Sequence, residues 1–197
     1  LELCIETFSE SLNYLNKLDM YSVNDQKANI LNNIGNAYRN LHDLNKALNY
    51  YQQALSLVNH DKHQLLRIYG NIGLTYKLLG DFELALDYFQ SALDYAIELG
   101  DKRNECIGLE HLGNCYICLH DFSKSLPYLE KSLQIANDMD FAIAKVNVYF
   151  DYGSIAAHNQ DYSEAKQYWQ LSLKKSIEIN YQKGISLANY SLSHLPK

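Results

Sequence analysis

The clearest hydrophobic pattern lies in the stretch NIGLTYKLLGDFELALDYFQSAL, which spans residues 71–93. Its apolar side chains recur with the spacing of two amphipathic helices, one before and one after Gly80-Asp81. The first stripe contains Ile72, Tyr76 and Leu79, and the second contains Ala85, Phe89, Ala92 and Leu93. Gly80 can end the first helix in a left-handed conformation, and the Asp81 side chain can cap the next helix. The stretch therefore predicts a helix–turn–helix pair that needs similar neighbours to bury both stripes.

The same pattern occurs three more times along the chain. Gly73 recurs as Gly35, Gly113 and Gly153, at steps of 38, 40 and 40 residues. Other positions recur with it: Asp81 as Asp43, Asp121 and Asp161; Ala85 as Ala47, Ser125 and Ala165; Phe89 as Tyr51, Leu129 and Trp169; Tyr76 as Tyr38 and Tyr116, but as Ala156 in the last copy. Small residues stand where helix backbones approach closely, and large ones fill the gaps. This repeat predicts an all-α protein with about ten helices and no strand.

The glycine, the tyrosine three residues later, the Gly-Asp turn and the spacing Ala-x-x-x-Tyr/Phe-x-x-Ala resemble the tetratricopeptide repeat family over nearly the whole chain. The usual period of that family is about 34 residues, and about six more are present here. The longer period is similar to that of Pins-type scaffolds and many bacterial regulators. The resemblance implies a right-handed α-solenoid of stacked helix–turn–helix repeats.

Aligning the copies gives the expected organisation of one domain over residues 1–197. It comprises the second helix of a truncated repeat (1–20), a linker (19–25), four full repeats (26–60, 63–100, 102–140 and 142–180) and the first helix of a further repeat (182–197). We therefore expect the chain to be a piece of a larger protein. Pro127 falls inside a predicted second helix, which we expect it to bend.

Composition narrows the classes of partner. The net charge of −6 argues against nucleic acid, whose phosphates require a basic face. No apolar run approaches the roughly 18 residues of a membrane span, and no signal peptide is visible. Four cysteines in such a chain are typical of reduced, mostly buried thiols. A cytoplasmic protein without a cofactor is therefore expected.

The resemblance implies a binding site on the concave face, which first helices line in this family. Asn36 and Asn114 directly follow the aligned glycines, and Asn32 lies one turn earlier. An asparagine amide both donates and accepts hydrogen bonds, so asparagines at helical spacing can hold a peptide backbone whatever its side chains are. Hydrogen bonding to neighbours within the protein is the simpler alternative for these residues. The resemblance favours a ladder that holds an extended peptide.

Charge is uneven along these positions. The first two repeats present Arg39, Arg67 and Lys77, and the later ones present Glu110, Asp151, His158, Phe150 and Tyr190. This distribution predicts that an acidic part of the peptide lies over the first two repeats, with an apolar side chain at the two aromatic residues. A clamp for chaperone tails is not predicted, because Ile107 and His111 stand where basic residues are needed.

A zinc site is the main chemical alternative, because His111, Cys115 and Cys118 share one predicted helix and His158 lies in the next repeat. Structural zinc usually takes cysteines from loops, and no second pair is present, so no metal is predicted. We see no nucleophile elbow, phosphate-binding loop or acid pair, which favours a non-enzymatic scaffold. Two alternatives stay open: a sensory or regulatory segment of a bacterial signalling protein, and a structural oligomerisation module that self-associates end to end.

Overall fold

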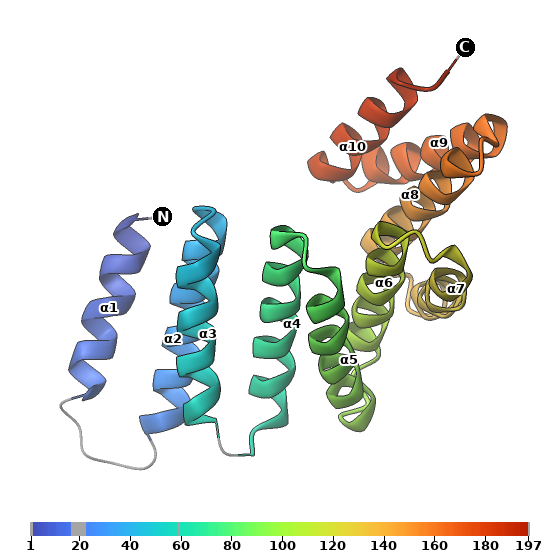
Figure 1. The fold of residues 1–197 in the computed structure, drawn as a ribbon. Coiled ribbons are helices and arrows are strands. Elements are labelled where there is room, and N and C mark those ends of the chain that lie inside the picture. Colours follow the sequence, from blue (N-terminus) through green and yellow to red (C-terminus); the bar gives the residue numbers. More distant parts are fainter. Residues whose placement is uncertain (1, 17–22, 59, 197) are drawn as a thin grey trace. The chain divides into compact units, whose positions relative to one another are not determined.

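The computed structural model describes residues 2–16, 23–58 and 60–196, and ten helices account for most of them (Figure 1). They are α1 (Glu2–Asn16), α2 (Asn24–Asn40), α3 (Leu44–Leu57), α4 (Lys62–Leu79), α5 (Phe82–Glu98), α6 (Lys102–Cys118), α7 (Phe122–Asp138), α8 (Ala142–His158), α9 (Tyr162–Glu178) and α10 (Gln182–Ser193). No strand occurs among the described residues. The predicted all-α fold of helix–turn–helix repeats is confirmed.

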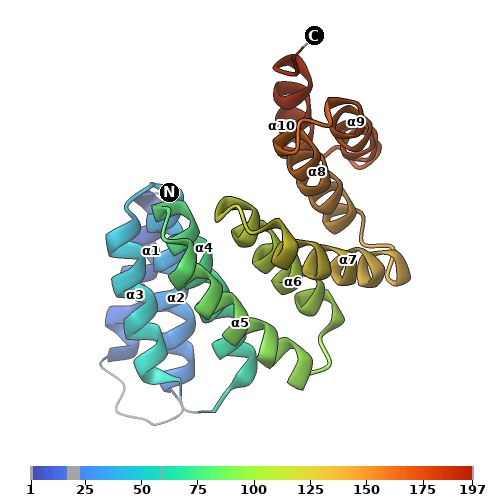
Figure 2. The same ribbon diagram turned by 45° about the vertical axis from the view of Figure 1, so that its right-hand side comes forward.

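The chain forms two compact units, residues 1–100 with α1–α5 and residues 101–197 with α6–α10. In the first unit α2 pairs with α3 and α4 with α5, and in the second α6 pairs with α7 and α8 with α9 (Figure 2). Within each unit the first helices of successive repeats also touch, α2 against α4 and α6 against α8. The single domain over residues 1–197 stays a prediction.

The incomplete repeats differ slightly from their predicted bounds. The helix expected over residues 1–20 is described as α1, which ends at Asn16, and residues 17–22 lie outside the described part of the chain. The predicted linker is wrong at its far end, because Asn24 and Asp25 already belong to α2. The helix expected over residues 182–197 is α10, which ends at Ser193 and packs on α9 and α8.

The turns inside the repeats follow the predicted mechanism. Gly80 adopts φ 82°, and the Asp81 carboxylate accepts a hydrogen bond from the Leu84 N–H at 3.2 Å. His42 and His120 take the positive φ in two of the other repeats, at 61° and 58°. A glycine is therefore one solution to this turn, and a residue with a tolerable left-handed conformation is another.

Close helix approach explains the aligned glycines. A Cβ added at Gly73 would lie 2.8 Å from the Phe89 ring, and one at Gly153 would lie 2.5 Å from the Trp169 ring. The second predicted stripe is buried throughout, as for Phe89 at 1% exposure. The first stripe is wrong at Leu79, which is 45% exposed because the helix ends there beside the turn.

Two further expectations concern Pro127 and the four thiols. Pro127 is exposed and lies inside α7, which runs without interruption from Phe122 to Asp138. The thiols are not mostly buried: Cys106 and Cys115 are buried, whereas Cys4 and Cys118 are exposed. Within the described residues, no helix has both the length and the apolar character needed to cross a membrane.

Candidate functional site

The first helices of the first unit are joined by a chain of polar side chains. Arg39 of α2 donates from Nη1 to the Asn71 Oδ1 atom of α4 at 3.0 Å, and Asn71 donates from Nδ2 back to the Asn32 Oδ1 atom of α2 at 2.9 Å. Asn32 is only 5% exposed, so water cannot easily replace this bond. These hydrogen bonds therefore fix the half-buried guanidinium of Arg39 on the surface formed by α2 and α4.

The same surface carries two more cations. Arg67 of α4 donates to Asn29 of α2, which is a third hydrogen bond between these two helices. Lys77 is half-buried near the C-terminal end of α4. We call the surface formed by α2 and α4, with its counterpart on α6 and α8, the first-helix face of each unit.

The first-helix face of the second unit has the same ladder with acidic members. Asn114 of α6 donates to the Asp151 carboxylate of α8 at 2.7 Å, and Asn147 of α8 donates to the Glu110 carboxylate of α6 at 3.2 Å. Glu110 and Asp151 are 6% and 3% exposed, and His111 Nδ1 lies 3.5 Å from Glu110 Oε2. Buried carboxylates need such donors, so the ladder here also holds the helices in register.

The predicted asparagines therefore bond within the protein. The bonds of Asn32 and Asn114 are given above. The third asparagine, Asn36, accepts a hydrogen bond from the Tyr51 hydroxyl at 2.8 Å. Tyr51 is fully buried, and this burial raises the pKa of its hydroxyl. One such bond does not exhaust an amide, which has two donors and a carbonyl oxygen. The structure supports the simpler alternative for these side chains and leaves their role in peptide binding as a proposal.

The predicted aromatic residues have different environments. Phe150 is half-buried, with its ring centroid 6.1 Å from that of Trp169. Tyr190 is 66% exposed, and its ring centroid lies 4.2 Å from that of His194, with the two rings tilted by 31°. His158 is exposed, with its ring 5.0 Å from that of His120. Phe150 thus serves partly as core, whereas Tyr190 offers a free ring face.

The histidines and cysteines of the alternative zinc site do not form a metal-binding group among the described residues. Among the described residues, no group of three or more His, Cys, Asp or Glu side chains lies close enough to hold a metal ion. Sequence reasoning named Asp151 but not its bond to Asn114, and it missed the ladder partners Asn29, Asn71 and Asn147. Their signal is positional, because each lies on a first helix within a turn of a predicted site residue or its equivalent.

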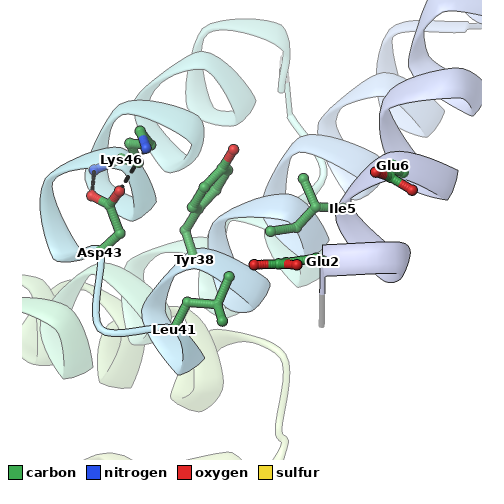
Figure 3. A pocket seen from close by; sticks show the side chains of 7 residues that line it. All are labelled: Glu2, Ile5, Glu6, Tyr38, Leu41, Asp43 and Lys46. Atoms are coloured by element: carbon green, nitrogen blue, oxygen red, sulfur yellow. Dashed lines mark hydrogen bonds and ion pairs between the residues drawn. The ribbon is translucent and has the colours of Figure 1, made fainter.

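Sequence reasoning also missed a cavity of about 530 Å³ in the first unit, between α1 and the turn from α2 to α3. Figure 3 shows the Tyr38 ring pointing into it, with Ile5 of α1 on one side and Lys46 on the other. The Lys46 ammonium lies 5.2 Å from the centroid of this ring and 2.8 Å from the Asp43 carboxylate. The hydrogen bond from Lys46 lowers the pKa of Asp43.

Several solved structures share this fold. The structure of aspartyl phosphate phosphatase F from Bacillus subtilis matches 94% of this chain at 16% identity with a TM-score of 0.80, over 48% of its own chain. A Rap protein complexed with competence and sporulation factor matches 95% at 18% identity and a TM-score of 0.76, over 52% of its own chain. A signal transduction ATPase with a tetratricopeptide repeat sensor, from Pyrococcus horikoshii, matches 91% at 20% identity and a TM-score of 0.76, over 28% of its own chain.

The chain thus spans about half the length of the first two of these proteins. At such identities the likeness shows the fold alone. No curated protein matches the sequence. A family profile described as tetratricopeptide repeat matches residues 26–98 and 65–138, together more than half of the chain. With the repeated helix pairs and the aligned glycines, this match establishes that the chain belongs to the tetratricopeptide repeat family.

Proposed function

We propose that the first-helix face binds an extended, partly acidic peptide segment of another protein, without catalysis. The observation that carries the proposal is the bonded chain from Arg39 through Asn71 to the buried Asn32. A guanidinium has five N–H donors, and the bond to Asn71 uses one of them. Because that bond already orders the long arginine side chain, a ligand carboxylate meets a cation with little conformational freedom left to lose.

The remaining groups of the face have complementary roles in this proposal. Arg67 and Lys77 attract further carboxylates of the peptide, and Asn36 and Asn114 bond to its backbone through amide atoms that their present partners do not use. In the second unit, the exposed ring of Tyr190 accepts an apolar side chain. Backbone pairing gives affinity without sequence choice, so the charged and aromatic groups set specificity.

The test compares a short peptide of alternating Glu and Ser residues with its Gln counterpart, by titration into the isotopically labelled chain. The Glu peptide is expected to shift the backbone amide resonances of α2 and α4, and the Gln peptide to bind more weakly. Arg39→Ala should weaken binding by about 0.5–1 kcal/mol, more at low salt than at high salt. Asn114→Ala should cost about 1–3 kcal/mol where it leaves a peptide amide unpaired.

Lys166→Ala is the matched control, because Lys166 is an exposed cation on α9, outside this face. Equal binding of both peptides, or parent-like binding by Arg39→Ala and Asn114→Ala at every salt concentration, would remove the first-helix face as the site.

A second candidate, the sensory segment of a larger regulator, is favoured by one specific observation. The similar Rap protein and signal transduction ATPase are each longer than this chain, which covers 52% and 28% of them. In this reading the peptide bound at the first-helix face controls a domain elsewhere in the protein. The test is the activity of the full-length protein with and without Arg39→Ala; an unchanged response to peptide would contradict it.

A further inference from the structure

The fourth repeat departs from the others at one place between its helices. In the first three repeats a tyrosine near the end of the first helix stacks on a tyrosine of the second helix. The pairs are Tyr38 with Tyr50 at 5.3 Å, Tyr76 with Tyr88 at 5.5 Å and Tyr116 with Tyr128 at 5.6 Å. In the fourth repeat Ala156 replaces the first tyrosine, and Tyr168 instead contacts Tyr152, one turn earlier, at 5.3 Å.

A second difference falls at the same place. In the first and third repeats a lysine three residues after the capping aspartate lies over the tyrosine ring. Lys46 is 5.2 Å from the centroid of Tyr38, and Lys124 is 5.6 Å from that of Tyr116. The residue at this position of the fourth repeat is Glu164. The fourth repeat therefore lacks both the ring and the cation, and it has an anion instead.

These two substitutions coincide with a cavity of about 370 Å³ between α7, α8 and α9. The residues that line it include Ala156, Ile155 and Tyr152 of α8, Tyr168 of α9 and Leu126 of α7. Two carboxylates also line it, Glu130 of α7 and Glu164 of α9. Among the described residues that line this cavity, none is lysine or arginine.

We propose that this cavity binds the side chain of a lysine or arginine from a partner protein. The two carboxylates attract the cation, the faces of Tyr152 and Tyr168 favour it through their negative quadrupole, and Leu126 and Ile155 contact its aliphatic stem. Burial, and after it the nearby Glu130 carboxylate, raises the pKa of Tyr152 to about 12. Glu130 and Tyr152 line the same cavity, so the carboxylate and the ring face can act on one bound cation.

The first unit has a cavity at the equivalent position, and there a lysine of the protein itself supplies the cation. Aligning Phe8 with Leu129 makes Ile5 the equivalent of Leu126, so the cavity in Figure 3 corresponds in position to the one in the fourth repeat. There Lys46 of the chain itself supplies the ammonium over the ring. This site is separate from the first-helix face, so the inference stands whether or not that face binds a peptide.

The first experiment follows the methyl resonances of Leu126 and Ile155 in the intact chain by NMR. The probes are Nα-acetyl-lysine methylamide and the norleucine analogue, which keeps the stem and lacks the ammonium. We expect the lysine probe to shift both methyl groups with a millimolar dissociation constant, and the norleucine probe to bind at least about five times more weakly. Equal binding of the two probes would overturn the inference, and so would equal binding of putrescine, because the cavity would then suit free amines.

A matched set of variants gives the second test. Glu164→Lys restores the lysine found in the first and third repeats, so it should weaken the lysine probe at least about tenfold. Ala156→Tyr should also exclude the probe by rebuilding the stack on Tyr168. Glu178→Gln removes an exposed carboxylate elsewhere on α9 and should bind like the parent. Circular dichroism melting shows that each variant is folded; unchanged binding by a folded Glu164→Lys protein would contradict the inference.

Discussion

Gly70 and Gly73 lie three residues apart in α4 and have opposite surroundings. A Cβ at Gly73 would meet the buried Phe89 ring at 2.8 Å, whereas one at Gly70 would have no heavy atom within 4 Å. Gly73→Ala should therefore lower the free energy of unfolding by about 1–3 kcal/mol through overpacking. Gly70→Ala is the control and should raise it by about 0.5–1 kcal/mol, because alanine favours the helix. Urea denaturation checks both; similar midpoints for the two variants would contradict the argument.

At this scale the sequence predicts packing better than hydrogen bonding. The aligned glycines and their large partners are visible because each has one neighbour at a fixed offset. The acceptor role of Asn36 is not visible, since it depends on the rotamer of Tyr51, fifteen residues away on another helix. The sequence shows that Ala156 replaces the repeated tyrosine. It does not show that Tyr168 then contacts Tyr152, because periodicity alone does not say which residue of α8 the Tyr168 ring will contact.

The bounds of single helices can be predicted from the residues at their ends, whereas the pairing of helices also depends on a few polar contacts. The capping aspartates give the starts of α3, α5, α7 and α9, which is why those bounds are predictable. The pairing of α6 with α7 includes a contact that no periodic pattern reveals. Glu105 of α6, only 4% exposed, binds Lys102 at 2.7 Å and Lys131 of α7 at 3.2 Å.

This contact predicts a pH-dependent stability. Burial opposes ionisation of Glu105, but the hydrogen bonds from Lys102 and Lys131 outweigh it and lower its pKa below the ordinary 4.5. A lowered pKa in the folded state stabilises the protein above the unfolded pKa, and this contribution is lost as pH falls through the folded value. Because both lysines are half exposed, Glu105→Gln should lower the free energy of unfolding at pH 7 by only roughly 0.5–1.5 kcal/mol.

At an acidic pH below the folded-state pKa of Glu105, the gap between Glu105→Gln and the parent should shrink, since Glu105 is then largely protonated in both states. Urea titrations at the two pH values measure it. Asp138→Asn, at an exposed position near the end of α7, is the control and should differ little from the parent at either pH. A deficit of the same size at both pH values would show that lost packing, rather than the ion pairs, explains the Glu105 variant.

For the whole molecule, the order and type of the helices are predictable, because each helix–turn–helix repeat has the same pattern of small and large residues. It does not determine what covers the outermost helices. In α1, Leu3 and Tyr14 are 74% and 67% exposed, and in α10, Leu187 and Tyr190 are 41% and 66% exposed. Such side chains are buried when a repeat has a neighbour of the same kind. The sequence leaves open whether that neighbour is more of the same chain, a partner or a second copy.

The charges of these two helices favour contact between α1 of one molecule and α10 of another. Glu2, Glu6 and Glu10 give α1 three carboxylates and no cation, whereas α10 contains Lys183 and no acid. A head-to-tail contact of this kind does not close on itself, so we expect weak, open-ended association that grows with protein concentration and weakens in high salt. Sedimentation velocity over a wide concentration range measures it. Tyr190→Ser should reduce the association, and Tyr162→Ser on α9 should not. A sedimentation coefficient that stays that of a monomer at all concentrations would leave α1 and α10 without this role and favour a different protein as their cover.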